Sequence, residues 1–208
     1  MSAAAKLDLY KEHKAEYAAR QKPSIVAVKK AAYLAVSGSG APGGEEFQAK
    51  IGALYSMAFT VKMTWKFDGR GDYTICKLEC QWWADDESVP FSARSPDEWR
   101  WRLLIRTPGF IKKRELANAR KVLAARGKGE GTDDVQLASL VEGRCVQALH
   151  VGPYEREHET IALMRDFATR EGLEFHGRHH EVYLSDPRRV PAERLKTILR
   201  LPVRKKRE

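Results

Sequence analysis

The feature that most limits what this chain can fold into is a strict alternation of side-chain character. It occurs in three segments, 74–83, 98–106 and 179–185. Side chains two residues apart share one face of a strand, so each segment predicts a β-strand with two different faces. In the third segment one face carries Glu181 and Tyr183, which we interpret as the lining of a ligand groove. The other face suits a core, and it holds His180, Val182 and Leu184. The alternative is a half-exposed strand whose polar face meets water.

Apolar residues at helical spacing predict helices between these strands. The clearest stripe is Phe47, Ile51, Leu54, Ala58 and Val61 in a helix over 45–65. Pro153 suits the first turn of a second long helix, because its fixed φ and missing N–H do no harm there. The other predicted helices cover 111–126 and, less regularly, 7–17; further predicted strands cover 24–28, 32–36, 144–151 and 194–203.

The order of these elements repeats along the chain. A strand, a turn, a helix and returning strands occur at 32–83 and again at 144–199. We therefore predict an α+β fold of two fused β-α-β-β modules, related by a pseudo-twofold axis around a central ligand groove, with the long helices on the sheet face opposite the groove. The predicted divisions are an N-terminal arm at 1–22, a ligand-binding domain at 23–203 with modules at about 23–110 and 140–203, and a basic tail at 204–208.

Charge and cysteine content narrow the class of protein. The 208 residues include 37 Lys and Arg against 28 Asp and Glu, a net charge of +9. The basic residues are spread along the chain and no nucleic-acid-binding motif is present, so nucleic acid is only a weak alternative partner. No apolar run is long enough to cross a bilayer. The three cysteines, an odd number without a secretory signal, indicate reduced thiols in a cytoplasm.

Neither a metal nor a cofactor is expected. His176, His179 and His180 cluster in the sequence, but a zinc site needs ligands that converge. His179 and His180 project to opposite faces of the predicted strand, so at most one of them faces the groove. The glycine-rich stretch 37–44 has no lysine at the spacing of a phosphate-binding loop. We predict hydrogen-bonding roles for these histidines.

Aromatic residues concentrate on two of the predicted strands. Four of the five tryptophans lie at positions 82, 83, 99 and 101. Such residues are usual core material, and they also make a wide flat wall for a planar ligand. Tyr55 and Phe59, four apart on the predicted helix over 45–65, face either a pocket or the core.

Several motifs resemble the GyrI-like small-molecule-binding family. They are Trp82-Trp83, Glu98-Trp99-Arg100-Trp101, Gly152-Pro153-Tyr154 and, above all, the run from His179 to Pro187. The resemblance implies tandem β-α-β-β modules around a groove that binds cationic or planar organic ligands. It assigns the acidic residue of that groove to Glu181, with Tyr183 beside it. It also implies a stand-alone protein, similar to members that hydrolyse cyclopropanoid DNA-alkylating compounds.

The function expected from sequence is therefore protective capture of a bulky, flat, apolar or cationic molecule, with hydrolysis of a cyclopropanoid toxin as the leading hypothesis. Glu181 is the candidate base and Tyr183 or Tyr55 the candidate oxyanion donor. The candidate ligand-binding residues are Tyr33, Phe59, Trp82, Trp99, Trp101, Tyr154 and His179. A non-enzymatic sensor or sequestering module is the alternative. Inhibition of a DNA-handling enzyme such as gyrase follows only from the family's name.

Overall fold

Two units make up the chain in the computed structural model, which describes residues 6–86 and 91–206. Unit 1 comprises Met1–Glu12, Ala31–Cys76 and Trp82–Leu140, and unit 2 comprises His13–Lys30, Lys77–Gln81 and Val141–Glu208. The chain passes from one unit to the other after residues 12, 30, 76, 81 and 140. The ends of the predicted arm and tail, 1–5 and 207–208, lie outside the described residues.

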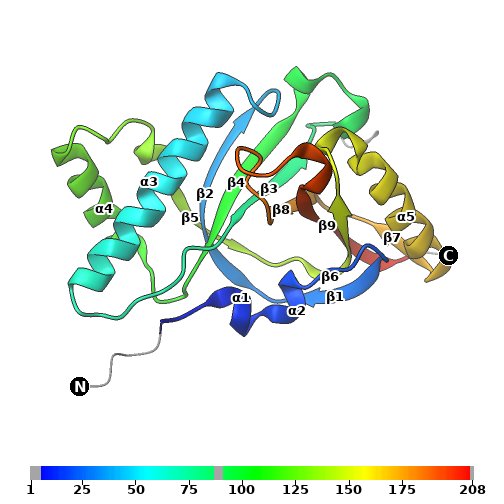
Figure 1. Cartoon of the computed structure of the whole chain (residues 1–208), viewed down its shortest axis with the longest axis horizontal. Coiled ribbons are helices and arrows are strands. Elements are labelled where there is room, and N and C mark those ends of the chain that lie inside the picture. The colour runs from blue at the N-terminus through cyan, green and yellow to red at the C-terminus, as the bar shows by residue number, and fades with distance from the viewer. Residues whose placement is uncertain (1–5, 87–90, 207–208) are drawn as a thin grey trace. The chain divides into compact units, whose positions relative to one another are not determined.

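Unit 1 is an antiparallel sheet with one long helix packed on it and a second helix beside the first. Its strands β2 (Ala31–Ser39), β4 (Arg100–Thr107) and β5 (Gln136–Leu140) lie in the order β4-β2-β5. Helix α3 (Glu45–Phe67) packs on β2 and β4, and α4 (Lys113–Ala125) lies beside α3 (Figure 1). The short α1 (Leu9–Glu12) also belongs to this unit.

Unit 2 has the same plan. Its sheet contains β1 (Ser24–Val28), β6 (Gly143–Val151), β9 (Lys196–Lys205) and β8 (His179–Tyr183) in the order β1-β6-β9-β8, and β7 (Leu173–Phe175) pairs with β9. Helix α5 (Glu157–Arg170) packs on β6, β7 and β9 (Figure 1), and the short α2 (Lys14–Tyr17) contacts β1. Strand β3 (Leu78–Trp83) begins in unit 2, beside β8, and ends in unit 1.

The two units share a β-α-β-β order, which confirms the predicted α+β class. The first occurrence is β2, α3, β3 and β4, which belong to unit 1 except for the first part of β3. The second, in unit 2, is β6, α5, β8 and β9, with the short β7 after α5. In each unit the last strand of the order pairs with the first, and a further strand, β5 or β1, pairs with the first strand on its other side.

Helix α5 identifies the two faces of the sheet in unit 2. Its buried Met164 and Ala168 pack in one cluster with Ala148 of β6 and Leu199 of β9. Leu199 is the cross-strand partner of both Ala148 and Glu181, and directly opposed residues of antiparallel strands share a face. Helix α5 and Glu181 therefore lie on the same face, so the prediction of a helix opposite Glu181 is wrong for α5.

Most predicted elements are present, with shifted ends. Strands β3 and β8 are shorter than the alternation in the sequence, because 74–77 and 184–185 lie outside them. Residues 154–156 form a 3₁₀ turn, so α5 starts four residues after Pro153. The predicted N-terminal helix is two short helices, and β5 and β7 were not predicted.

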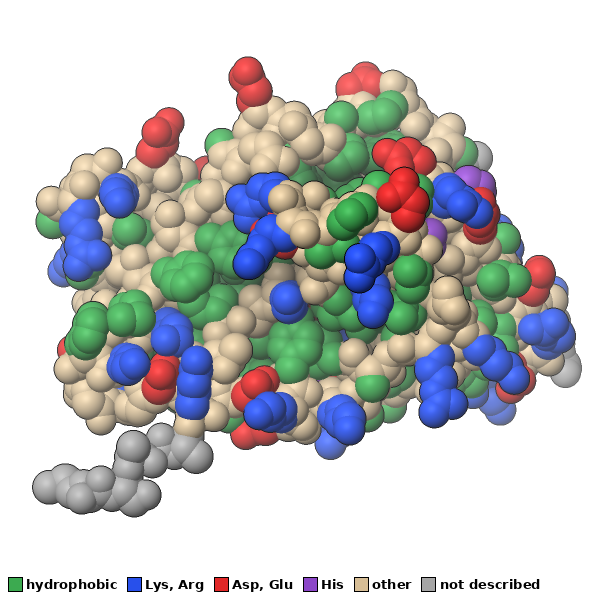
Figure 2. Space-filling model, in the orientation of Figure 1, with side chains coloured by type: hydrophobic (Ala, Val, Ile, Leu, Met, Phe, Trp, Pro, Cys, Tyr) green, Lys and Arg blue, Asp and Glu red, His purple; other side chains and the backbone are tan. Residues whose placement is uncertain are grey.

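The spread of charged side chains and the hydropathy of the helices agree with what the composition predicts. Figure 2 shows basic side chains in several separate places on the visible face, with acidic side chains among them. Within the described residues, no helix is both long enough and apolar enough to span a membrane. All three cysteines are buried, and none of them is in a disulfide.

Candidate functional site

Glu181, on β8 in unit 2, is the centre of a buried polar cluster. Tyr183 donates a hydrogen bond of 2.6 Å from its hydroxyl to Oε2 of Glu181. Nε2 of His179 lies 3.1 Å from Oε1, and it donates, because an ionised carboxylate only accepts. Glu181 is 7% exposed and His179 is 6% exposed. The predicted shared face of these three residues is confirmed, and it places one donor on each carboxylate oxygen.

A second carboxyl group, which we did not predict, joins this cluster from the first turn of α5. Glu157 is 7% exposed, and a ligand atom of its carboxyl lies within 4.8 Å of those of His179 and Glu181. Burial, and then the charge of Glu181, raises the pKa of Glu157 to about 10. Burial and the neighbouring carboxylate therefore both favour the protonated form of Glu157.

One signal in the sequence could have revealed Glu157. It stands four residues before Ile161 and seven before Met164, and so continues the apolar stripe of α5. An acid at a stripe position predicts either a charge at the end of the helix or a buried carboxyl group with a function.

The tyrosines of the cluster are held in their neutral forms. Burial, followed by the charge of Glu181, raises the pKa of Tyr183 well above its ordinary value. Burial also raises the pKa of Tyr154, mainly with the charges of Glu157 and Glu181, to about 12. The two rings meet edge to face at 5.9 Å between centroids. Tyr154, predicted as a ligand contact, thus lies next to Tyr183.

Glu157, His179 and Glu181 also form the kind of group that can hold a metal ion. Each offers one ligand atom, and a histidine with two carboxylates suits a divalent transition metal. No metal had been expected here, because the sequence placed at most one histidine on the groove face, and it did not bring Glu157 to His179 and Glu181.

The opposite face of β8 carries charge where an apolar face was predicted. His180 is fully buried, with Nδ1 2.8 Å from Oε1 of Glu142 and Nε2 3.1 Å from Oε2 of Glu79. Arg200 of β9, also fully buried, donates to Oε2 of Glu142 at 3.1 Å and to Oε1 of Gln147 at 3.0 Å. His180 is buried and hydrogen-bonded, as predicted, but the apolar character predicted for this face is wrong, because cross-strand partners cannot be identified from one strand alone.

The pKa values in this buried network favour charged groups. Burial alone would lower the pKa of His180, but the charge and hydrogen bond of Glu142, with those of Glu79, raise it to about 9. Burial likewise opposes ionisation of Glu142, yet His180 and Arg200 lower its pKa to about 2. The N-terminal arm is tied to the same network, since Arg200 donates to the Glu16 carbonyl and Tyr17 to Glu79.

The other predicted site residues belong to unit 1. Trp101 is fully buried and Trp82 nearly so, and both rings pack against Phe47. Tyr33 is equally buried, in a cluster with Leu104. Contact of these three side chains with a ligand stays a prediction. The remaining candidates in unit 1 are the partly exposed Trp99 and Tyr55 and the exposed Phe59, whose ring lies beside that of Tyr55.

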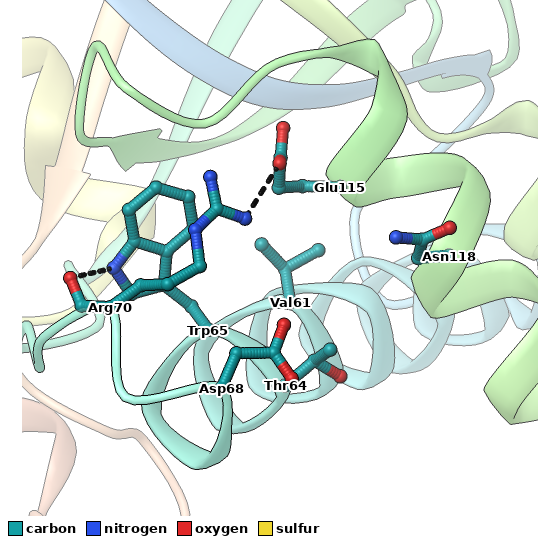
Figure 3. Close-up of a pocket in the computed structure, with 7 residues that line it drawn as sticks. All are labelled: Val61, Thr64, Trp65, Asp68, Arg70, Glu115 and Asn118. Carbon is teal, nitrogen blue, oxygen red and sulfur yellow. Dashed lines mark hydrogen bonds and ion pairs between the residues drawn. The ribbon is translucent and has the colours of Figure 1, made fainter.

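Two hollows lie elsewhere in the units. The first, in unit 1, has a volume of about 10 Å³, the room that one water molecule needs. Figure 3 shows Arg70 reaching over Trp65 to Glu115, with 3.5 Å from the guanidinium carbon to the indole centroid. The second, about 270 Å³ in unit 2, is lined by Gln21, Leu149, His150, Val151, Arg156, Glu159, Thr160 and Leu163. The first is too small for an organic ligand.

Comparison with known proteins identifies the family. Residues 111–204 match the model of the GyrI-like small molecule binding domain. A crystal structure of an uncharacterized conserved protein from Listeria innocua is 38% identical, with a TM-score of 0.89, and the match covers 96% of this chain and all of that one. The chain belongs to the GyrI-like small-molecule-binding family. The predicted resemblance is thereby confirmed.

Two further relatives have titles that indicate an activity. Crystal structures titled as a hydrolase from Listeria innocua, and as a hydrolase encoded by lin2189 of that organism, are 38% and 37% identical, with TM-scores of 0.85 and 0.87. Both matches cover 96% of this chain and 100% of the other. The C-terminal domain of EcmrR shares the fold at 10% identity and a TM-score of 0.56, covering 88% of this chain and 98% of that one. Comparison with curated protein sequences gives no match.

Proposed function

We propose that this GyrI-like protein binds a bulky, flat organic molecule against Glu181 and hydrolyses cyclopropanoid alkylating compounds, protecting the cytoplasm from them. The observation that carries the proposal is the fixed carboxylate of Glu181, with one hydrogen bond to each oxygen and 7% of its surface exposed. The titles of two relatives support a hydrolytic reaction.

The reaction consumes one water molecule. Glu181 takes a proton as the water oxygen bonds to the exposed CH₂ of the cyclopropane. The ring carbon–carbon bond breaks, and its electron pair moves through the dienone to the carbonyl oxygen, which then takes up a proton. A carboxylate that is held in place by hydrogen bonds and largely shielded from bulk water is suited to this step.

Tyr183 has a different role in this proposal from the one first predicted. Its hydroxyl hydrogen is directed at Glu181, so it orients the base rather than meeting the oxyanion. Tyr55 stays a predicted oxyanion donor. We therefore treat Tyr183 as a positioning residue, and Tyr183→Phe should mainly make the orientation of the Glu181 carboxylate less fixed.

The test is turnover of a cyclopropyl-dienone alkylator supplied in excess over the protein. Wild type should release the ring-opened, water-added product over many cycles. Glu181→Gln should lower the rate by a factor of about 10²–10⁴, the usual effect of losing a general base, while the compound still binds. Glu159→Gln, an exposed position on α5, is the matched control and should keep the wild-type rate. Normal turnover by Glu181→Gln would remove Glu181 from the mechanism.

A second function, sequestration without turnover, is favoured by one observation. Both oxygens of Glu181 already accept hydrogen bonds, which stabilises the carboxylate and suits electrostatic capture of a cation. In that case the alkylator would form a one-to-one complex with no released product. Glu181→Gln would then weaken binding of a cation more than binding of a neutral ligand of the same shape.

A further inference from the structure

Three side chains of the kinds that bind metal ions converge in the buried cluster of unit 2. Glu157 of α5 and His179 and Glu181 of β8 each offer one ligand atom, and these atoms lie within 4.8 Å of one another. None of the three residues is more than 7% exposed. Two buried carboxylates this close need a positive charge beside them, and a bound metal ion supplies it.

A buried oxygen of Glu157 points to a ligand at this place. Oε1 of Glu157 has no hydrogen-bond partner within the described part of the chain, although the residue is only 7% exposed. Buried polar atoms nearly always have a partner, so an exception indicates an ion, a water molecule or a functional role. The same carboxyl group lies within hydrogen-bonding reach of Glu181 and of Thr197 on β9. Its unpaired oxygen is therefore part of the cluster.

The spacing of the ligand atoms suits a transition metal. Nε2 of His179 and Oε1 of Glu181 are 3.1 Å apart. Two ligands of a tetrahedral zinc ion, each at about 2.0–2.2 Å from the metal, lie roughly 3.3–3.6 Å from each other. The two atoms therefore need to separate by only roughly 0.2–0.5 Å, and a rotation of the Glu157 side chain completes the set. Three protein ligands leave the fourth position to water.

The donor atoms favour zinc over magnesium and calcium. One imidazole nitrogen with two carboxylate oxygens suits zinc and its neighbours in the first transition series, whereas Mg²⁺ and Ca²⁺ prefer oxygen ligands alone. Tyr183 donates a 2.6 Å hydrogen bond to Oε2 of Glu181, which orients the carboxylate whose other oxygen faces the metal. In the metal-bound form, His179 carries its hydrogen on Nδ1 and offers Nε2 to the ion. An ion bound between side chains needs no ligand-sized hollow.

From this geometry we propose that Glu157, His179 and Glu181 bind one zinc ion, and that the bound ion stops Glu181 from acting as a base. The zinc site goes beyond the proposed function and does not depend on it. The inhibition rests on the proposed function, because a coordinated carboxylate can no longer take a proton from water. The protonated form of Glu157 described above belongs to the metal-free site.

The first measurement counts zinc in the absence of any organic ligand. Protein freed of metal with EDTA is mixed with zinc chloride, separated by gel filtration and analysed by mass spectrometry for bound metal. Wild type should retain one zinc ion per chain. Tyr183→Phe should weaken binding by about 10–100-fold, the usual effect of losing a partner of a ligand, and Glu157→Gln should weaken it by more. Glu157→Met replaces Glu157→Gln if that variant does not fold.

Matched controls separate this site from zinc bound elsewhere. Glu159→Gln and His158→Gln change exposed residues of the same helix, and both should bind zinc as wild type does. Cobalt(II) in place of zinc should give the visible absorption of a tetrahedral site without the near-ultraviolet band of a thiolate ligand. Absence of bound zinc in wild type, equal binding by the folded Glu157 variant, loss of binding in His158→Gln, or a thiolate band overturns the site.

The second measurement adds zinc to the turnover of the cyclopropyl-dienone alkylator. Saturating zinc should suppress turnover by wild type, EDTA should restore it, and magnesium chloride should have no effect. Full turnover with the site filled, or turnover that requires zinc, overturns the inhibition and leaves the zinc site supported. If metal-free wild type shows no turnover, the inhibition falls together with the proposed function, and the zinc count still decides the site.

Discussion

Units 1 and 2 follow the same order of strands and helix, yet only unit 2, among the described residues, pairs a buried histidine and a buried arginine with buried carboxylates. The sheet of unit 1 is packed with rings such as Tyr33 and Trp101, whereas that of unit 2 buries His180, Glu142 and Arg200. Unit 1 also buries charged side chains, Arg106 of β4 and Glu115 of α4, but most of its buried side chains are apolar. Buried ion pairs are often no better for stability than apolar groups, so the network in unit 2 needs another explanation. His180 and Glu181 are consecutive on β8, and the network that holds His180 therefore also fixes the strand that carries Glu181.

The largest effect should come from removing the cation of this network. Arg200→Met leaves Glu142 buried with one partner fewer, and should lower the free energy of unfolding by about 3–5 kcal/mol. Arg204→Met, on the exposed part of the same strand, should change it by at most about 1 kcal/mol. Urea unfolding followed by circular dichroism measures both. Equal losses for the two variants would mean that the buried charges do not support unit 2.

The next effect is a dependence of stability on pH. The pKa of His180 is about 9 in the folded protein, above its ordinary value of 6.5, so its contribution is complete below pH 6.5 and is lost as pH rises through 9. Glu157, whose pKa is also raised, acts in the same direction at high pH. In a Glu157→Gln background, the free energy of unfolding should still fall between pH 6.5 and 10. A flat profile there would show that His180 is not held as a cation.

At low pH the expected change of stability with pH has the opposite sign, because of Glu142. Its pKa is lowered from 4.5 to about 2, so its contribution is present above pH 4.5 and is lost as pH falls through 2. Urea unfolding between pH 2 and 5 should show this loss in wild type, and less of it in Glu142→Gln. An exposed control, Glu155→Gln, should keep the wild-type profile.

The smallest effect tests the ring packing of unit 1. A Cβ at Gly38 would collide with the indole of Trp101, so Gly38→Ala should destabilise the protein by about 1–3 kcal/mol. Gly52→Ala is the control, because no atom lies within 4 Å of a Cβ there and alanine favours a helix by about 0.5–1 kcal/mol. All five tryptophans belong to unit 1, so their fluorescence during thermal unfolding reports this unit. If both variants melt alike, the close approach at Gly38 does not limit the packing.

The sequence predicted the helices and strands better than the contacts between them. Alternation placed Glu181 and Tyr183 on one face of β8, and helical spacing located α3 and α5, because both patterns depend only on neighbours along the chain. The same information could not show that His180 meets Glu79 and Glu142, which lie 101 and 38 residues earlier. Glu157 was missed for the same reason, since its importance depends on contact with another element.

Two strands were not predicted because their local sequence patterns are weak. Strands β5 and β7 have five and three residues, too few for alternation to be distinguished from a loop. Trp82 and Trp101 are a separate case: the sequence fitted both a ligand wall and a core, and their contact with a ligand stays a prediction. Their burial against Phe47 depends on α3, which a strand pattern cannot include.

The interleaving of the two units along the chain sets an order for synthesis on the ribosome. Strand β1 is made early, but its partner β6 begins at Gly143, and β6 in turn pairs with β9, which ends at Lys205. The strands of unit 1 are complete once Leu140 has emerged. During synthesis β1 must therefore wait as an unpaired strand while unit 1 forms, and unpaired strands are prone to wrong association. Lys29 and Lys30, which directly follow β1, put two positive charges beside this waiting strand and disfavour its pairing with another copy.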